Sequence, residues 1–217
     1  SGEVLFKGRK LTHSKADRRD LGRSISVVFQ DPATALNPRM IVHDTLIDPL
    51  NVHGIGSPKD REARVRELLE LVGLPLSALD VLPRQISGGQ RQRVWIAMAL
   101  AQETDILLLD EPTTYLDLAH QVELLDLLSE LNEQRGTTMI MVLHELNLAA
   151  RVADYLVAMK DGSIVAHGEA HDVLTRENLH TIFSLKAEVA DPFNDGSVVV
   201  VPHPRSASTV AGSAVAS

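Results

Sequence analysis

The segment from Ile106 to Glu111 constrains the fold of this chain more than any other part of the sequence. Ile106–Leu109 is an apolar run that is too short for a buried helix. It therefore predicts a strand that is buried on both faces, as the strands of parallel sheets are. Asp110 and Glu111 follow directly, so two carboxylates are expected at the carboxyl end of this strand, where open α/β sheets bind their ligands.

The alternation of elements after this strand predicts a doubly wound α/β fold. A helix is expected over about 118–135, a β-rich run over 138–143 and a second helix over 145–153. Two further strands are expected over 155–159 and 163–167. Strands that alternate with helices are typical of a largely parallel sheet covered by helices.

The flanking segments have other patterns. Residues 3–11 predict two short strands around a turn at Gly8, and Ile25–Phe29 predicts another short strand. Residues 32–104 are mostly helical in pattern and lie between strands, which indicates an inserted helical lobe. Residues 203–217 consist largely of Ser, Ala, Gly and Val without periodicity and are expected to be disordered.

Three helices are expected inside the helical lobe. A short one covers about 41–48. A longer one begins after Ser57, with proline at its first helical position, and ends at Gly73. The third covers about 88–102.

The composition limits the classes of function. The chain has 217 residues, of which 44% are hydrophobic and only 3% aromatic, so an aliphatic core is expected. A net charge of −8 argues against broad binding to nucleic acid or anionic membranes, although a local basic patch is compatible with it. The chain has no cysteine, and its longest apolar run, Val94–Ala101, falls short of the roughly 18–20 residues of a spanning helix.

The residues Ser87-Gly88-Gly89-Gln90 open the third helix of the lobe. Glycines let backbone N–H groups approach an anion closely, and a helix N-terminus carries a partial positive charge. The hydroxyl of Ser87 can donate a hydrogen bond to a phosphate oxygen. The alternative is an ordinary glycine-rich helix start without a ligand.

Other polar residues are expected at the carboxyl edge of the sheet. Asp110 can hold a magnesium ion, and Glu111 can polarise an attacking water. Gln30 and His144 each follow a strand, which places them at the same edge. Taken singly, each has a structural alternative: an acidic turn, a loop glutamine or a structural histidine.

The order of these motifs resembles the ATP-binding subunits of ABC transporters over about residues 1–202. The motifs are Phe29-Gln30-Asp31, Ile86 to Gln90, Ile106 to Pro112, Leu116-Asp117 and His144. Ile86 stands where the family usually has Leu. The resemblance implies a RecA-like α/β ATPase core over 1–31 and 105–202, and a helical lobe over 32–104 that ends in the signature motif.

The resemblance also implies a role for each motif residue. Gln30 corresponds to the Q-loop glutamine, which touches magnesium and the attacking water. Ser87, Gly88, Gly89 and Gln90 correspond to the signature motif, which grips the γ-phosphate of a nucleotide bound mainly by the opposite subunit.

The remaining roles belong to the sheet edge and the dimer interface. Asp110 corresponds to the Walker B aspartate, a magnesium ligand, and Glu111 to the catalytic glutamate. By the same resemblance, Asp117 would lie in the D-loop at the dimer interface, and His144 would be the switch histidine that faces the γ-phosphate. ATP and Mg²⁺ are the implied substrate and ion.

One motif of the family is missing from the sequence. A phosphate-binding loop reads Gly-x-x-x-x-Gly-Lys-[Ser/Thr], and none of the six lysines is followed by Ser or Thr. Ser1-Gly2-Glu3-Val4 resembles the segment that follows this loop in the family. The first strand and the phosphate loop are therefore expected to be cut off upstream, and the chain alone is expected to bind ATP weakly without turning it over.

Two importer subfamilies are represented. Phe29–Pro32 and Asn37–Met40 resemble oligopeptide importers, whereas residues 94–202 resemble iron–siderophore importers over a longer stretch. We therefore expect an energy-coupling subunit of a bacterial siderophore importer, with an oligopeptide or dipeptide importer as the alternative. A catalytically inactive interaction subunit and a soluble ABC ATPase of DNA repair or translation are the other hypotheses.

The importer hypothesis implies particular partners and a location. The partners are a second ATPase subunit in a homodimer or heterodimer, integral membrane permease subunits and, indirectly, a periplasmic or surface binding protein, but no nucleic acid. The chain is expected at the cytoplasmic face of the membrane as a peripheral protein. Residues 31–50 are predicted to dock on the permease through Leu36, Met40 and Ile41, which are expected to be exposed. The alternative is that these three side chains pack inside the helical lobe.

Overall fold

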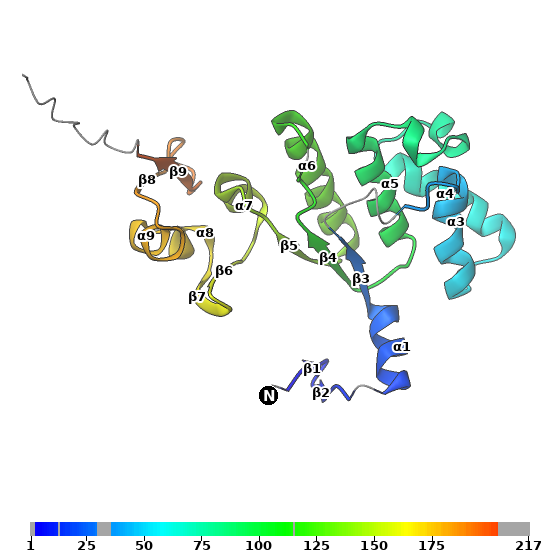
Figure 1. Ribbon diagram of the computed structural model, residues 1–217, viewed down its shortest axis with the longest axis horizontal. Helices are drawn as coiled ribbons and strands as arrows, with labels where there is room; N and C mark the ends of the chain where they lie inside the picture. Colours follow the sequence, from blue (N-terminus) through cyan, green and yellow to red (C-terminus); the bar gives the residue numbers. More distant parts are fainter. Residues whose placement is uncertain (1–2, 13, 30–35, 115, 204–217) are drawn as a thin grey trace, which may run out of the picture. The chain divides into compact units, whose positions relative to one another are not determined.

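The computed structural model describes residues 3–12, 14–29, 36–114 and 116–203 (Figure 1). The chain divides into two compact units, residues 1–144 and 145–217. The predicted disordered tail lies outside the described residues except for its first residue, His203.

A three-stranded parallel sheet forms the centre of the first unit. Its strands are β3 (Ile25–Val28), β4 (Ile106–Asp110) and β5 (Thr138–Val142), in the order β3-β4-β5. The register pairs Val28 with Leu109, and Leu109 with Met141. The parallel sheet predicted from the apolar strand at 106 is confirmed, and its order brings the carboxyl ends of the three strands to one edge.

The prediction that β4 is buried on both faces is wrong in part. Leu107 and Leu109 are buried on one face, together with Val28. On the opposite face Ile106 and Leu108 are only half-buried. Val27 and Ile140, which the neighbouring strands pair with Leu108, are 39% and 55% exposed. This face is open among the described residues, so an apolar run did not suffice to specify two covered faces.

Helices connect β3 to β4. In chain order these elements are α3 (Val42–His53), α4 (Pro58–Leu71), the 3₁₀ turns Leu76–Asp80 and Pro83–Gln85, and α5 (Gly88–Leu100). The predicted helix start at Ser57 is confirmed, because its side chain and that of Asp60 cap each other's backbone N–H groups. The short helix predicted at 41–48 extends to His53 and ends at Gly54 in a left-handed conformation.

The helical segment contains many buried aliphatic side chains. The large and fully buried side chains of this segment belong to Leu46, Leu50, Leu68, Leu69, Trp95 and Ile96. Trp95 is the single tryptophan of the chain, so aliphatic residues supply nearly all of these buried side chains, as the composition predicts. The division of the chain into an ATPase core and a helical lobe at 31/32 and 104/105 stays a prediction.

Helix α6 (Leu118–Arg135) connects β4 to β5 and confirms the predicted helix over 118–135. Leu124, Leu128 and Leu131 are buried along one side at helical spacing. The helix ends at Gly136, whose φ of 64° lies in the left-handed region. A residue with a Cβ is strained there, which explains the glycine.

The N-terminal segment of the first unit contains an element that the sequence pattern did not reveal. The predicted hairpin is present as β1 (Leu5–Phe6) and β2 (Arg9–Lys10). A ten-residue helix, α1 (Lys15–Ser24), follows it. Its start is capped by Ser14, whose side chain accepts a hydrogen bond from the backbone of Asp17.

The second unit is built from short elements around a small apolar core. The elements are α7 (Leu146–Val152), β6 (Leu156–Lys160), β7 (Ser163–Gly168), α8 (Ala170–Val173), α9 (Arg176–Phe183), β8 (Ala187–Ala190) and β9 (Val199–Pro202). The core contains Leu174, Leu179, Ala187 and Val200. The predicted strands at 155–159 and 163–167 are present as the antiparallel hairpin β6-β7.

The part of the chain that the structure describes contains no helix that is both long and apolar enough to cross a membrane.

Replacing the glycine that ends α6 gives a test of this local analysis. Gly136→Ala should lower the free energy of unfolding by about 1 kcal/mol, because alanine is strained in the left-handed conformation. Gly22→Ala should raise it by about 0.5–1 kcal/mol, because this glycine is helical and a Cβ there meets nothing within 4 Å. Urea denaturation of both variants measures the two changes. If the two substitutions changed the free energy of unfolding in the same direction, the assigned backbone roles would be contradicted.

Candidate functional site

Glu111 is the most constrained residue at the carboxyl edge of the sheet. It follows β4 directly, and its backbone N–H donates to the carbonyl of Val142, the last residue of β5, at 3.2 Å. Its φ of 49° lies in the left-handed region, which is unusual for a residue with a Cβ. Backbone strain of this kind collects at functional sites.

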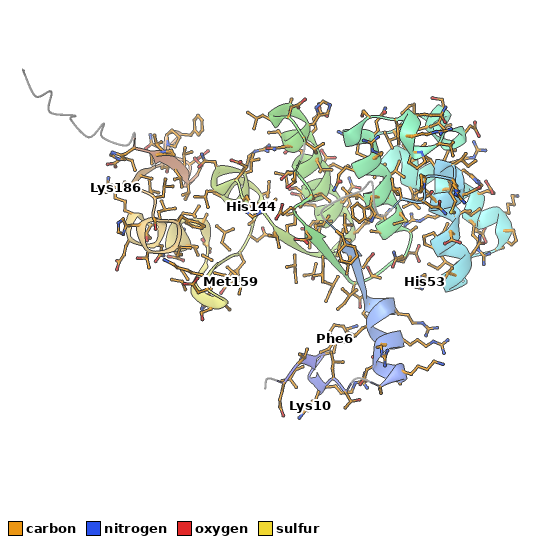
Figure 2. All side chains as sticks on the ribbon, viewed as in Figure 1. Phe6, Lys10, His53, His144, Met159 and Lys186 are labelled. Carbon is orange, nitrogen blue, oxygen red and sulfur yellow. The ribbon has the colours of Figure 1, made fainter. Side chains whose placement is uncertain are left out.

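The side chains of His144 and Thr114 both contact the carboxylate of Glu111. His144 follows β5 (Figure 2), and its Nε2 lies 2.6 Å from Oε1 of Glu111. The hydroxyl of Thr114 donates to Oε2 at 3.0 Å. The Glu111 side chain is only 18% exposed, whereas that of His144 is 69% exposed. The carboxylate is therefore fixed in orientation, and its histidine partner faces solvent.

Asp110 is the last residue of β4 and is exposed. Its carboxylate is a hard oxygen ligand of the kind that Mg²⁺ prefers. Among the described residues no group of three or more His, Asp or Glu side chains is placed to hold a metal ion. Mg²⁺ is usually bound by one or two carboxylates, with water and substrate phosphates as its other ligands.

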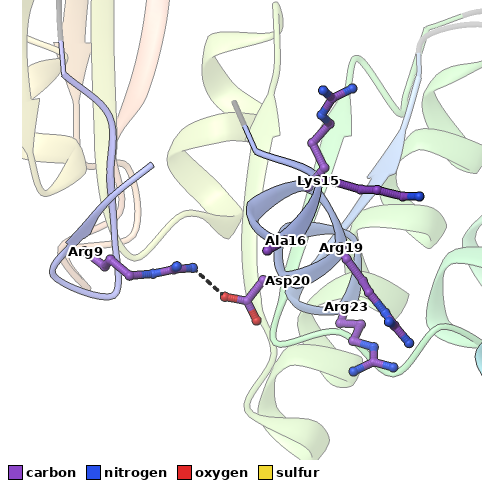
Figure 3. Close-up of a pocket in the computed structure, with 7 residues that line it drawn as sticks. Arg9, Lys15, Ala16, Arg19, Asp20 and Arg23 are labelled. Carbon is purple, nitrogen blue, oxygen red and sulfur yellow. Dashed lines mark hydrogen bonds and ion pairs between the residues drawn. The ribbon is translucent and has the colours of Figure 1, made fainter. Parts of the chain in front are cut away.

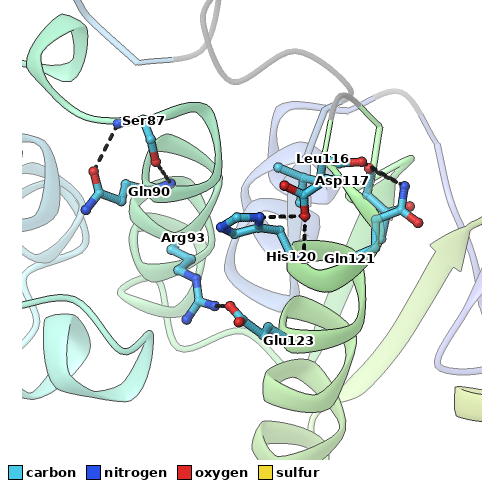
Figure 4. Close-up of polar contacts among 9 residues, drawn as sticks. Ser87, Gln90, Arg93, Leu116, Asp117, His120, Gln121 and Glu123 are labelled. Carbon is cyan, nitrogen blue, oxygen red and sulfur yellow. Dashed lines mark hydrogen bonds and ion pairs between the residues drawn. The ribbon is translucent and has the colours of Figure 1, made fainter.

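The helix start at Ser87 forms a second cluster (Figure 4). The Ser87 hydroxyl oxygen accepts from the backbone N–H of Gln90 at 3.2 Å, and Oε1 of Gln90 accepts from the backbone N–H of Ser87 at 3.0 Å. This reciprocal cap fixes both side chains. Gly88 and Gly89 occupy the first turn of α5, where backbone N–H groups lack partners within the helix.

Asp117 caps the next helix, α6. Its Oδ1 accepts from the backbone N–H of His120 at 3.0 Å and lies 2.7 Å from the ring Nδ1 of the same residue. These two hydrogen bonds hold the pKa of Asp117 below its usual value, and the one from the backbone N–H has the larger effect. Asp117 is therefore ionised at neutral pH and fixed against His120.

Contacts between α5 and α6 connect these two helix starts. Arg93 of α5 forms an ion pair with Glu123 of α6 at 2.9 Å (Figure 4). Arg93 also donates to the carbonyl of Val72 at 3.1 Å. A Cβ on Gly89 would lie 3.6 Å from the ring of His120. Sequence reasoning missed these residues; only the i,i+3 spacing of Asp117 and His120 offered a signal.

The predicted site residues thus fall into two groups. Glu111 and His144 are in direct contact, and Asp110 precedes Glu111 at the same sheet edge. Ser87, Gly88, Gly89 and Gln90 form the capped start of α5, beside the segment that contains Asp117. Gln30 lies outside the described residues.

The predicted exposure of the segment after Gln30 is not confirmed. Leu36 is only 2% exposed, and Met40 and Ile41 are half-buried. Residues 31–35 lie outside the described residues. Leu36 is buried, so the prediction that it is available to a partner is wrong.

Three features point to one protein family: the carboxylates of Asp110 and Glu111 at the sheet edge, the histidine in contact with Glu111, and the glycine-rich helix start. Sequence comparison identifies this family. The family described as "ABC transporter" matches residues 1–114, and the chain belongs to this family. Its fold is that of the ABC ATPases, an α/β domain with a parallel sheet.

Relatives and solved structures agree with this membership. The probable siderophore transport ATP-binding protein YusV of Bacillus subtilis is 42% identical over 208 residues, which cover 94% of this chain and 74% of YusV. The dipeptide transport ATP-binding protein DppD of Haemophilus influenzae is 43% identical over 169 residues, which cover 77% of this chain and 51% of DppD. CbiO1 of Clostridium perfringens, part of the CbiONQ transporter complex, superposes with a TM-score of 0.72 at 30% identity over 83% of this chain and 71% of CbiO1.

The cap at Asp117 predicts a pH dependence of stability. Its lowered pKa means that the contribution of the ionised cap is present above the unfolded-state pKa of about 3.9 and is lost as the pH falls through the lower folded-state value. The destabilisation caused by Asp117→Ala should therefore shrink as the pH is lowered from 7 towards 3. Thermal unfolding across this range measures it, with the exposed α6 residue Glu130→Ala as control; a difference that grows on acidification would contradict the cap.

Proposed function

We propose that this chain is the ATP-binding and hydrolysing energy-coupling subunit of a bacterial ABC importer for iron–siderophore complexes. The 2.6 Å contact between Glu111 and His144 carries the ATPase part of the proposal. The similarity to a siderophore transport protein over 94% of the chain supports the cargo. Cargo would bind other subunits, so the residues discussed here serve nucleotide chemistry.

In the proposed mechanism Glu111 polarises the water that attacks the γ-phosphate. A carboxylate whose two oxygens are held by Thr114 and His144 is oriented before the substrate arrives, which favours general-base catalysis. His144, which faces solvent and contacts this carboxylate, would donate a hydrogen bond to the γ-phosphate.

Asp110 and Gln30 are the residues that would hold magnesium, and the bound ion neutralises phosphate charge. The carboxylate of Asp110 fits this role because it is exposed at the end of β4. For Gln30 the support is its place after β3 in the sequence and the family motif that contains it.

The signature residues Ser87, Gly88, Gly89 and Gln90 would bind the γ-phosphate of a nucleotide held by a second ATPase subunit. The cap described above uses the hydroxyl oxygen of Ser87 and the amide oxygen of Gln90 as acceptors. Their O–H and N–H₂ groups are left to donate, and phosphate oxygens are acceptors. Asp117, which begins the neighbouring helix, would face the same dimer interface.

The partners proposed for this chain are those of an importer ATPase. They are a second ATPase subunit, integral membrane permease subunits and, indirectly, a periplasmic or surface binding protein, but no nucleic acid. A solved ATP-binding cassette with 31% identity and a TM-score of 0.68 is dimeric and bound to ADP and Pi, which supports the dimer. The proposed location is the cytoplasmic face of the membrane, where the permease would hold the chain.

Dipeptide import is the second candidate, and a specific observation favours it. The dipeptide transport protein DppD matches with 43% identity over 77% of this chain. A catalytically inactive interaction subunit is the third candidate, because the printed sequence has no phosphate-loop motif. Titration with ATP and Mg²⁺ and a turnover assay, both on the chain joined to a phosphate loop of this family, separate the third candidate from the first two, because an inactive subunit would gain no turnover.

The catalytic and cargo assignments can be tested together in cells. A chromosomal Glu111→Gln substitution keeps the shape of the side chain but removes the base, so ATP-driven uptake should fall about 10²–10⁴-fold. We expect the loss in uptake of radiolabelled ferric siderophore and no change in dipeptide uptake. Glu130→Gln, an exposed acid on α6, is the matched control and should leave both rates unchanged.

Each other outcome has a definite meaning. Loss of dipeptide uptake with normal siderophore uptake would support the catalytic role of Glu111 and would show that the cargo is a dipeptide. Normal uptake of both cargoes in the Glu111→Gln strain would refute the catalytic role in either transporter.

A further inference from the structure

A part of the chain that the proposed function does not use contains a concentration of positive charge. Seven of the 21 basic residues lie within residues 1–24, together with only three of the 29 acidic residues. The rest of the chain is strongly acidic. A short cationic segment in an acidic protein is the electrostatic pattern of a site for an anion, because it creates a local potential opposite in sign to that of the whole molecule.

These cations line an open concavity of about 930 Å³ beside α1, here called the basic hollow (Figure 3). Its charged lining residues are Arg9, Lys15, Arg18, Arg19, Asp20 and Arg23. Lys15, Arg19 and Arg23 follow one another at intervals of four residues, so they lie along one stripe of the helix. The hollow therefore has five cationic side chains and one carboxylate.

Arg9 engages two acidic groups near the hollow. Arg9 forms ion pairs with Asp17 and with Asp20, each at 2.9 Å. Asp17 is buried and accepts two hydrogen bonds from Thr12, which hold its pKa below the usual value. Asp17 thus remains ionised and fixes Arg9 at the rim of the hollow.

The stripe on α1 has no such compensation. Lys15, Arg19 and Arg23 are exposed and form no ion pair among the described residues. Like charges four residues apart destabilise a helix, and α1 contains two such pairs in succession. A local feature that costs stability without a compensating contact is typical of a binding surface.

We propose that the basic hollow binds phosphate groups, carried either by an anionic lipid headgroup or by a free polyphosphate. Guanidinium groups bind phosphate oxygens in pairs, and four of the five cations are arginines. Helix α1 is only about 15 Å long, so it spans a few phosphates rather than an extended polymer. Among the described residues, none that lines the hollow is aromatic and able to stack on bases, which disfavours single-stranded nucleic acid.

The test compares two triple variants of the full chain. The hollow variant is Lys15→Gln, Arg19→Gln and Arg23→Gln; glutamine is a good helix former and none of the three side chains holds an ion pair. The control variant is Lys59→Gln, Arg66→Gln and Lys186→Gln, which makes the same change in net charge at exposed positions outside the hollow. Circular dichroism shows whether each variant is folded.

Two probes distinguish the source of the phosphate. Cosedimentation uses phosphatidylcholine vesicles with and without phosphatidylglycerol, and titration calorimetry uses inorganic pyrophosphate. Wild type and control should bind at least one phosphate-bearing probe at low salt, and the hollow variant should bind it at least about tenfold more weakly, since each cation near an anionic surface contributes about fivefold. Added salt should weaken this binding.

The outcomes decide the proposal. Hollow-dependent binding to phosphatidylglycerol vesicles identifies a headgroup site, and hollow-dependent binding of pyrophosphate identifies a site for free phosphates. Equal affinity of wild type and hollow variant, or binding of neither probe, overturns the proposal. If the triple variant does not fold, Arg19→Gln alone should weaken binding several-fold, and an unchanged affinity refutes the site.

Discussion

Parallel pairing of three strands is the constraint on which the rest of the first unit depends. Because β3, β4 and β5 run in the same direction, everything that follows them in sequence starts from one edge of the sheet. That is why Glu111 and His144, 33 positions apart, meet at 2.6 Å. The same geometry requires long connections between strands, which here are α6 and the helical segment from α3 to α5.

Helix starts have a double role in this protein. Ser87 and Asp117 each satisfy backbone N–H groups at the start of a helix, and each also lies in a segment whose sequence resembles a motif of the ABC transporter family. A cap that uses acceptor atoms holds a side chain in place while its donors remain available. Ordinary hydrogen bonds at the helix ends therefore suffice to hold these two side chains in place.

The sequence predicted elements whose signal is local. The strand at 106 and the helices that begin at Ser57 and Asp117 have apolar periodicity or a capping residue, and the structure confirms them. Helix α1 was missed because its buried residues are Asp17 and Ser24, so it has no apolar stripe to detect. The contact of Arg93 with Glu123 was equally inaccessible, because it depends on how two helices pack.

The left-handed backbone at Glu111 has a consequence for how this position tolerates change over evolutionary time. Glycine, asparagine and aspartate adopt φ near 49° more readily than glutamate does, so neutral drift at such a turn should move towards them. Glutamate persists at this position only while the function of its side chain outweighs the cost of the left-handed backbone conformation. The identity of residue 111 is therefore a sensitive marker of whether a lineage still uses this carboxylate.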